Sequence, residues 1–432
     1  MPSYRQPSYR QPGTVLTDHI FSVPLDHDRP DGERIEVFAR EVAAADAAAA
    51  GRPWLVFLQG GPGFGAPRPH GRDSWLDRAL RDYRVLLLDQ RGTARSTPAG
   101  RQSLARFGTA GEQARYLAHF RADSIVRDAE LIRQQITGGE PWSVLGQSFG
   151  GFCTVTYLSL APGGIREAFI TGGLPGLDTT ADDLYRITYG KVAEKTAEHY
   201  QRYPGDVEQA RRIARYLRGD QVVLPGGAPL TVEAFQWLGQ MLGASTGSDD
   251  LHYLIEDPFT GGTLSDAFLH AVQHRLSFAE APLYAVLHEA CYAQGGPTRW
   301  SAHRVRAEAG GFDPAAALDG DAPLPLTGEM IYPWMFDLDP VLRPLKAVAE
   351  ILAERDDWPP LYDPARLAAN EVPVAAAVYF NDMYVPTELS VPTGRAIAGL
   401  RAWVTSEYEH DGLRASNGAV LDRLIALARG TA

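Results

Sequence analysis

Several short runs of hydrophobic residues along the chain are each followed by a turn that contains glycine. Runs that are apolar on both faces are typical of strands buried inside a parallel sheet. The four clearest runs are Trp54–Leu58, Val85–Leu88, Trp142–Leu145 and Ala168–Thr171. We therefore predict a buried parallel sheet with loops at the carboxyl ends of its strands.

A helical pattern separates the second of these runs from the third. Ile125, Ala129, Ile132 and Ile136 recur at helical spacing and share one face, and Gly138 marks the end of the pattern. Strands that alternate with helices favour the α/β class, here a mostly parallel, doubly wound sheet with helices on both faces.

The amino-terminal segment has a different character. Residues 2–11 repeat Pro-Ser-Tyr-Arg-Gln and lack the apolar stretch of a signal peptide, so we expect residues 1–14 to be a flexible tail. The segments Ile20–Leu25 and Arg34–Val42 are β-branched and bounded by turn residues, which predicts two strands.

The strand signals stop near residue 176 and return near the carboxyl end. Helical patterns and aromatic residues fill the intervening region, with helices expected over Tyr185–Tyr203, Val207–Leu217 and Val232–Leu242. The late elements are strands over Val374–Phe380 and Leu400–Val404 and a helix over Val420–Ala428. One α/β domain with a helical insertion explains this order. The expected division is a core of residues 15–175 and 346–432 and a helical cap of residues 176–345.

Composition excludes several classes of protein. The 432 residues are 45% hydrophobic and 22% charged, as in ordinary globular proteins. The formal charge of −12, without a basic block, argues against a nucleic-acid partner. The two cysteines, Cys153 and Cys291, are too few for a disulfide scaffold or a four-thiolate zinc site. No apolar run approaches the ~20 residues of a membrane helix, so we expect a cytoplasmic protein.

The segment Gly146-Gln147-Ser148-Phe149-Gly150 fits the pattern G-x-S-x-G. The pattern alone is weak, but here it follows a predicted strand and precedes a segment, Phe152–Leu160, that can form a helix. A strand–turn–helix elbow exposes its serine at the start of the helix, which predicts a nucleophile at Ser148.

A serine hydroxyl needs a base, and the base needs an orienting acid. In α/β hydrolases these residues follow the serine in the order acid, then histidine. Asp382 stands at the end of a late predicted strand, and His410 is the only histidine beyond it. The chain order therefore selects Ser148, Asp382 and His410 as catalytic residues.

The loop Gly60–Gly63, which follows the first buried run, indicates an oxyanion hole. Glycines let backbone N–H groups approach a developing negative charge, so Gly60 or Gly61 and the N–H of Phe149 are the expected donors. The loop lacks the Lys-Ser/Thr of a phosphate-binding loop. His270 and His274 lie four residues apart but lack the glutamate of a zinc motif, so they are interpreted as a solvated helix face.

Three motifs together resemble the proline iminopeptidases, which are serine peptidases of the α/β-hydrolase fold. They are Gln59-Gly60-Gly61-Pro62-Gly63, Asp89-Gln90-Arg91-Gly92-Thr93-Ala94-Arg95-Ser96 and Gly146-Gln147-Ser148-Phe149-Gly150-Gly151. The resemblance spans residues 15–430. It departs at Gln59, where many members have histidine, and at Ala94, where many have glycine. The resemblance places the triad on the same Ser148, Asp382 and His410.

The resemblance implies a substrate with a free N-terminal proline and no metal or cofactor. Recognition of the substrate's ammonium group requires carboxylates near the nucleophile, which the family places in its helical cap. Glu289 and Glu329 lie among apolar and aromatic residues of the predicted cap and are the candidates. Tyr292 and Trp334 are candidates for the walls of a slot for the proline ring.

The sequence leaves two other functions open. An esterase or amidase with a different small acyl substrate would use the same scaffold, because a fold does not fix a substrate. A hydrolase-like binding protein without activity is the remoter alternative, since Ser, Asp and His all stand in the required order. An aspartate-nucleophile dehalogenase or epoxide hydrolase is disfavoured by the serine in the elbow. The sequence carries no signal of oligomeric state.

Overall fold

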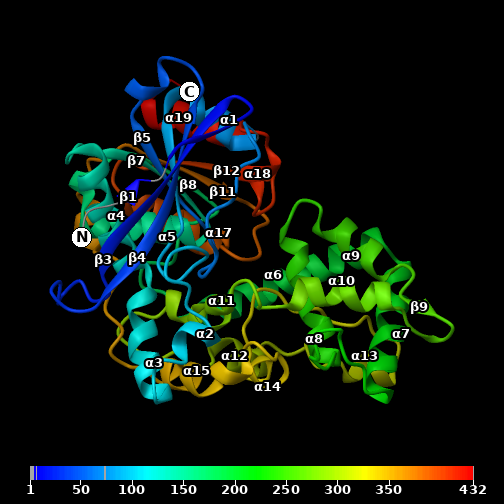
Figure 1. Ribbon diagram of the computed structural model, residues 1–432. Coiled ribbons are helices and arrows are strands. Elements are labelled where there is room, and N and C mark those ends of the chain that lie inside the picture. Colours follow the sequence, from blue (N-terminus) through cyan, green and yellow to red (C-terminus); the bar gives the residue numbers. More distant parts are fainter. Residues whose placement is uncertain (1–3, 6, 73, 432) are drawn as a thin grey trace.

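The computed structural model describes residues 4–5, 7–72 and 74–431, and its centre is one large mixed β-sheet (Figure 1). The strand order is β1-β3-β4-β6-β5-β7-β8-β11-β12, with β2 paired to β3. The strands are β1 (Tyr4–Arg5), β2 (Tyr9–Gln11), β3 (Thr14–Pro24), β4 (Arg34–Ala44), β5 (Trp54–Leu58), β6 (Arg84–Leu88), β7 (Trp142–Gln147), β8 (Ile165–Thr171), β11 (Val374–Tyr379) and β12 (Arg401–Thr405).

The six strands from β6 to β12 in this order run parallel, and β3 and β4 join them antiparallel at one edge. All eight predicted strands are present, and the predicted α/β class is confirmed. The expected tail is partly wrong, because Tyr9–Gln11 pairs with β3 instead of remaining loose. Residues 1–3 and 6 of that tail lie outside the described residues.

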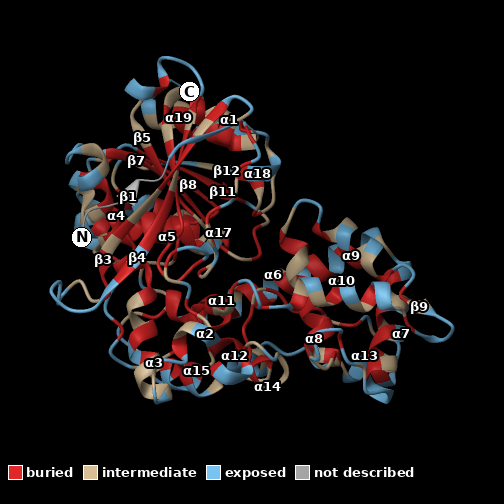
Figure 2. Cartoon of the chain, viewed as in Figure 1, coloured by how far each residue is buried: buried red, intermediate tan, exposed pale blue. Residues whose placement is uncertain are grey.

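Helices cover both faces of the sheet and enclose two separate apolar cores (Figure 2). On one face α1 (Ser74–Asp82) packs with α19 (Ala419–Arg429), and on the other α4 (Ala122–Thr137) packs with α5 (Phe149–Leu160). The helix α4 ends at Gly138, whose φ of 69° is the left-handed conformation that favours glycine. The predicted helices at residues 125–136 and 420–428 are therefore confirmed.

The described chain between β8 and β11 forms helices and one short antiparallel hairpin. Figure 1 shows these elements gathered on one side of the sheet. The longer helices are α6 (Ala181–Arg202), α7 (Gly205–Gly219), α9 (Gly247–Ile255), α10 (Asp266–Leu276), α12 (Ser301–Ala309) and α15 (Lys346–Ala353); the shorter ones are α8 (Val232–Gln236), α11 (Pro282–Leu287), α13 (Ala315–Asp319), α14 (Met335–Leu338) and α16 (Pro364–Ala368), and the hairpin is β9 (Phe259–Thr260) with β10 (Thr263–Leu264). The division at residues 175/176 and 345/346 stays a prediction.

The remaining helices connect the strands. Two lie between β6 and α4, where α3 packs beside α15 from the later part of the chain (Figure 1). They are α2 (Arg101–Leu104) and α3 (Ala110–Leu117), and near the carboxyl end come α17 (Thr387–Ala396) and α18 (Gly412–Ala415). Within the described residues, none of the helices has both the length and the apolar character needed to span a membrane.

Candidate active site

Ser148 occupies a sharp turn between β7 and α5. Its φ of 54° and ψ of −125° lie in a region that residues other than glycine rarely adopt. The turn is held because the Ser148 N–H donates to the carbonyl oxygen of Thr171 at 3.0 Å. The predicted strand–turn–helix elbow is therefore present, with Ser148 directly before the first residue of the helix.

Close packing around the turn explains its glycines. A Cβ on Gly150 would lie 1.9 Å from the carbonyl oxygen of Leu58, and one on Gly146 would lie 2.3 Å from the carbonyl oxygen of Gly150. A Cβ on Gly60 would lie 2.9 Å from the Cβ of Ser148. The loop after β5 and the start of α5 can therefore touch only because these positions lack side chains.

We expect Gly150→Ala to lower the free energy of unfolding by about 3 kcal/mol, because the new methyl group would overlap backbone atoms that cannot move independently. Gly190→Ala in α6 is the matched control: its Cβ meets nothing within 4 Å. That change should raise stability by up to about 1 kcal/mol, the helix preference of alanine over glycine. Denaturant unfolding measures both, and equal effects of the two changes would contradict this packing.

His410 and Asp382 form a buried pair that connects two loops at the carboxyl edge of the sheet. The Nδ1 of His410 lies 2.6 Å from the Oδ2 of Asp382, and Asp382 is fully buried. The other carboxylate oxygen accepts hydrogen bonds from the N–H groups of Tyr384 at 2.8 Å and Val385 at 3.0 Å. Asp382 is therefore held in place beside the imidazole of His410, and its role as the orienting acid stays a prediction.

The environment favours the protonated ring of His410. Burial by itself disfavours that charge, but the carboxylates of Asp382 and Glu329 outweigh burial and raise the pKa of His410 above its usual value. Gly172 lets the backbone after β8 lie close to the His410–Asp382 pair. A Cβ at this position would lie 3.1 Å from the Nδ1 of His410 and 3.3 Å from the Oδ2 of Asp382.

The two loops expected to supply oxyanion donors adjoin the serine. Phe149 is the first residue of α5, so its N–H points out of the helix end without an intrahelical acceptor. Gly60 and Gly61 line the same cavity as Ser148. The structure thus places the three residues next to the nucleophile, and their role as oxyanion donors stays a prediction.

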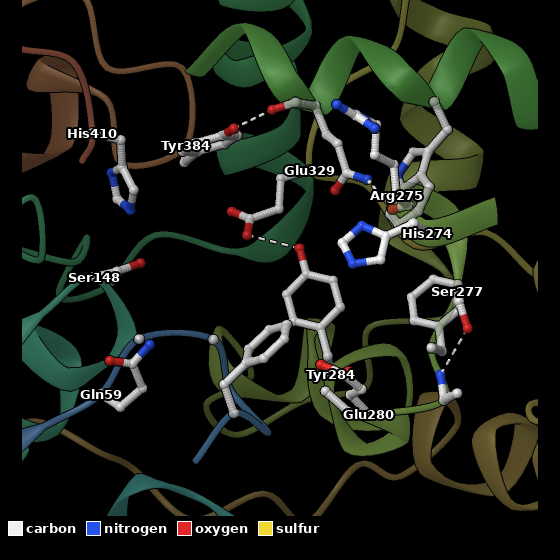
Figure 3. A pocket seen from close by; sticks show the side chains of 18 of the residues that line it. Gln59, Ser148, His274, Arg275, Ser277, Glu280, Tyr284, Glu329, Tyr384 and His410 are labelled. Carbon is white, nitrogen blue, oxygen red and sulfur yellow. Dashed lines mark hydrogen bonds between the residues drawn. The ribbon is translucent and has the colours of Figure 1, made fainter. Parts of the chain in front are cut away.

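Ser148 and His410 open into a cavity of about 740 Å³ between the sheet and the helices that follow β8 (Figure 3). Figure 3 shows the two side chains on one wall, with His274, Arg275 and Ser277 across the cavity. The aromatic lining residues are Phe64, Trp237, Phe278, Tyr284 and Tyr384, and the ionisable ones besides tyrosine are His270, His274, Arg275, Glu280, Glu329, His410 and Arg414.

Glu329 lies in the middle of this cavity, between the Ser148–His410 wall and His274 (Figure 3). Its Oε1 accepts a hydrogen bond from the Tyr284 hydroxyl at 2.7 Å. Burial raises the pKa of Glu329 to about 7, although His410 and the tyrosine hydrogen bond act in the opposite direction. A half-buried carboxylate with one neutral partner is suited to bind a cationic group.

Glu289, the other expected ammonium ligand, does not line this cavity. Its two carboxylate oxygens accept hydrogen bonds from the N–H groups of Ser301 at 3.0 Å and Ala302 at 2.9 Å, at the beginning of α12. The carboxylate therefore satisfies backbone donors of a helix amino terminus. Because this carboxylate already has partners inside the helical region, the structure gives no support to the expectation that Glu289 contacts substrate.

The two expected slot residues also lie elsewhere. Tyr292 is packed edge-on against Phe152 and Tyr185, and Trp334 lines a separate, smaller cavity beside the first. His270 and His274 are exposed as interpreted, but the face they share borders the large cavity. Among the described residues no group of three or more His, Cys, Asp or Glu side chains could hold a metal.

Sequence reasoning missed two tyrosines of the site. Tyr284 is the hydrogen-bond partner of Glu329, and the ring of Tyr384 stands edge-on to His410 with centroids 4.8 Å apart. The position of Tyr384 two residues after Asp382 was a usable signal. Nothing in the sequence pattern distinguishes Tyr284 from the other aromatics of its region.

Comparison with known proteins agrees with the resemblance that the Gly60 loop and the Ser148 elbow indicate. Over 418 residues the chain is 50% identical to a proline iminopeptidase of Aeromonas sobria, a match that covers 96% of this chain and 97% of that one. The chain belongs to the proline iminopeptidase family. A second member, proline iminopeptidase aneH of Aspergillus aculeatus, is 36% identical over 436 residues, which cover 97% of this chain and 95% of the relative.

The fold assignment is equally clear. A family profile described as the alpha/beta hydrolase fold matches residues 53–216, which include the Gly60 loop and the Ser148 elbow. Among solved structures, a bromoperoxidase from Bacillus anthracis matches with a TM-score of 0.40 and 12% identity, over 95% of this chain and 99% of that one. The family profile and the sheet described above show that this proline iminopeptidase family member is an α/β hydrolase, as its motifs predicted.

Proposed function

We propose that the protein is a serine aminopeptidase that releases N-terminal proline from peptides, with Ser148, His410 and Asp382 as its catalytic triad. The observation that carries the proposal is the half-buried Glu329 carboxylate in the same cavity as Ser148 and His410. An enzyme for uncharged acyl groups has no need of a carboxylate there, whereas an aminopeptidase must hold an ammonium group.

In the first half of the reaction the Oγ of Ser148 attacks the carbonyl carbon of the prolyl residue. The Nε2 of His410 takes the hydroxyl proton, while Asp382 holds the ring through Nδ1 and stabilises the imidazolium. Negative charge develops on the substrate oxygen, where the N–H groups of Phe149 and of Gly60 or Gly61 stabilise it. The C–N bond then breaks, and His410 gives its proton to the departing amine.

The second half repeats these steps with water. His410 takes a proton from a water molecule that attacks the prolyl ester on Ser148, and the oxyanion donors act again. The ester bond breaks, Ser148 regains its proton from His410, and free proline leaves. The bonds formed and broken in the two halves require no metal and no cofactor.

Substrate recognition is assigned to Glu329 and the aromatic residues around it. The proline ammonium pairs with the Glu329 carboxylate, and Tyr284 holds that carboxylate in place. Tyr284 and Phe64, whose ring centroids are 5.3 Å apart, provide apolar surface for the pyrrolidine ring. These residues replace Tyr292 and Trp334 in the account of the slot.

Blocking the substrate amine tests the proposal. Prolyl-naphthylamide with a free amine should be cleaved at least about 100-fold faster, in kcat/KM, than its N-acetyl derivative, because acetylation removes the charge that Glu329 binds. Equal rates on the two compounds would support an esterase or amidase instead. No turnover of either compound, and no labelling by a fluorophosphonate, would support a binding protein.

The pH dependence of kcat/KM should follow the titration of Glu329 and His410. Activity requires Glu329 to be charged and His410 to be neutral, and both protonate as the pH falls. Since the pKa of Glu329 is about 7 and that of His410 is raised, kcat/KM should fall below about pH 7 with a logarithmic slope approaching two. Glu329→Gln should reduce this slope to one, whereas Glu280→Gln in the same cavity should leave it at two. An unchanged slope in Glu329→Gln would contradict the assignment.

The proposed substrates are small peptides with a free N-terminal proline. The cytoplasmic location expected from the sequence remains a prediction.

A further inference from the structure

The charges of the large cavity are separated. Glu329 stands near the Ser148–His410 wall, whereas His274 and Arg275 lie on the other side of the cavity (Figure 3). Arg275 is partly exposed and Arg414 is exposed, and His270 and His274 accompany them. Glu280 is the only other carboxylate among the described residues that line the cavity.

Arg275 and Arg414 belong to those arginines of this acidic chain that have no carboxylate partner among the described residues, and both line the cavity. The sequence has 53 acidic and 41 basic residues, and many arginines in the structure pair with a carboxylate. Within the described part of the chain, neither Arg275 nor Arg414 lies within 4 Å of a carboxylate oxygen. The single side-chain hydrogen bond of Arg275 goes to the carbonyl oxygen of Ala271 in its own helix, at 3.1 Å. Two guanidinium groups thus border the cavity with unused donors.

The two arginines belong to two different helices that border the cavity. Arg275 lies in the last turn of α10, across the cavity from Ser148 (Figure 3). Arg414 lies in α18, four residues after His410. Because His410 must protonate the departing amine, the leaving part of a substrate passes on the His410 side of the site, where Arg414 is. The Arg414 guanidinium would therefore contact the C-terminal end of a short peptide.

We propose that Arg275 and Arg414 bind the C-terminal carboxylate of short peptides, so that prolyl dipeptides and tripeptides with a free carboxylate are the preferred substrates. The inference rests on the proposed function. A short peptide at neutral pH is a zwitterion, and the cavity offers the Glu329 carboxylate for its ammonium group and two guanidinium groups for its carboxylate. Guanidinium groups match carboxylates in shape as well as charge. The volume of about 740 Å³ is in the range of small-molecule sites.

The test compares each peptide with its C-terminal amide, which differs only in the terminal charge. The kcat/KM values for Pro-Gly-Gly and Pro-Gly-Gly-amide, and for Pro-Gly and Pro-Gly-amide, are measured by the release of proline at low ionic strength. We expect the free acid to exceed the amide about fivefold for at least one of the two peptide lengths, with the ratio falling toward one as salt is added. The ratio is then measured in Arg275→Gln, Arg414→Gln and the double variant.

The double variant should have an acid-to-amide ratio near one, and at least one single variant should have a reduced ratio. Arg423→Gln is the matched control, because Arg423 is exposed on α19 away from the cavity, and its ratio should equal that of the wild type. The ratio cancels any general loss of activity, including an effect of Arg414 on His410.

A wild-type ratio near one for both peptide lengths, or a double variant that keeps the wild-type ratio, would overturn the inference. In either case continued release of proline from the amides would leave the proposed function intact. If the wild type releases proline from none of the four peptides, the proposed function fails, and the inference fails with it.

Discussion

Ser148→Ala is expected to lower kcat for prolyl substrates by about 10⁴- to 10⁶-fold, which is the range for removal of a triad nucleophile. The residue adopts a φ of 54° in the elbow and borders the cavity beside His410. Alanine keeps the backbone turn and the oxyanion donors but removes the atom that forms the acyl-enzyme. Steady-state rates with prolyl-naphthylamide measure the effect.

Ser277→Ala is the control for this change. Ser277 lines the same cavity on its opposite side, and its Oγ accepts a hydrogen bond from the N–H of Ala279 at 3.2 Å. It has no histidine–aspartate pair beside it, so its loss should change kcat by less than tenfold. If Ser148→Ala retained more than a hundredth of the wild-type kcat, Ser148 would not be the nucleophile.

Glu329→Gln is expected to lower kcat/KM for free-amine prolyl substrates by about 100-fold. The neutral amide keeps the size and the hydrogen bond to Tyr284 but loses the charge that faces the ammonium group, and charged hydrogen bonds of this kind contribute about 1.5–3 kcal/mol. Labelling of Ser148 by a fluorophosphonate should continue, because the probe carries no ammonium group. Loss of labelling together with activity would mean that Glu329 supports the triad itself.

Glu289→Gln, in contrast to Glu329→Gln, should affect stability and leave substrate recognition unchanged. Its amide can replace only one of the two acceptor contacts at the start of α12, so we expect a decrease of about 1–3 kcal/mol in the free energy of unfolding. The preference for a free amine over an N-acetylated substrate should stay at the wild-type value. A loss of that preference would indicate that Glu289 binds the ammonium group of the substrate.

The sequence predicted the sheet, which the structure confirms, and it led to the triad hypothesis, because both rest on local patterns. An apolar run of four or five residues followed by glycine indicates a buried strand wherever it occurs, and the order of Ser148, Asp382 and His410 follows from strand order. Because β7, β8 and β11 pair side by side in parallel, their carboxyl ends lie at the same edge of the sheet. This pairing brings Ser148 close to Asp382, 234 positions later in the chain, and to His410, 262 positions later.

The helical region was less predictable for a physical reason. Burial, aromatic neighbours and a charged side chain describe Glu289 and Glu329 equally well in the sequence, and only tertiary packing separates them. The Glu289 carboxylate accepts hydrogen bonds from the amino terminus of α12, whereas the Glu329 carboxylate accepts one from Tyr284 and borders the cavity. Similarly, the repeat at the amino terminus has the composition of a loose tail, but the exposed edge of β3 gives Tyr9–Gln11 a partner.

Peptide mapping after reaction with a fluorophosphonate tests the central claim most directly, because it identifies the activated hydroxyl without assuming a substrate. We expect one modified residue, Ser148, and slower modification when a prolyl peptide with a free amine occupies the cavity. Modification of a different residue, or continued release of proline after Ser148 has been fully modified, would show that Ser148 is not the nucleophile.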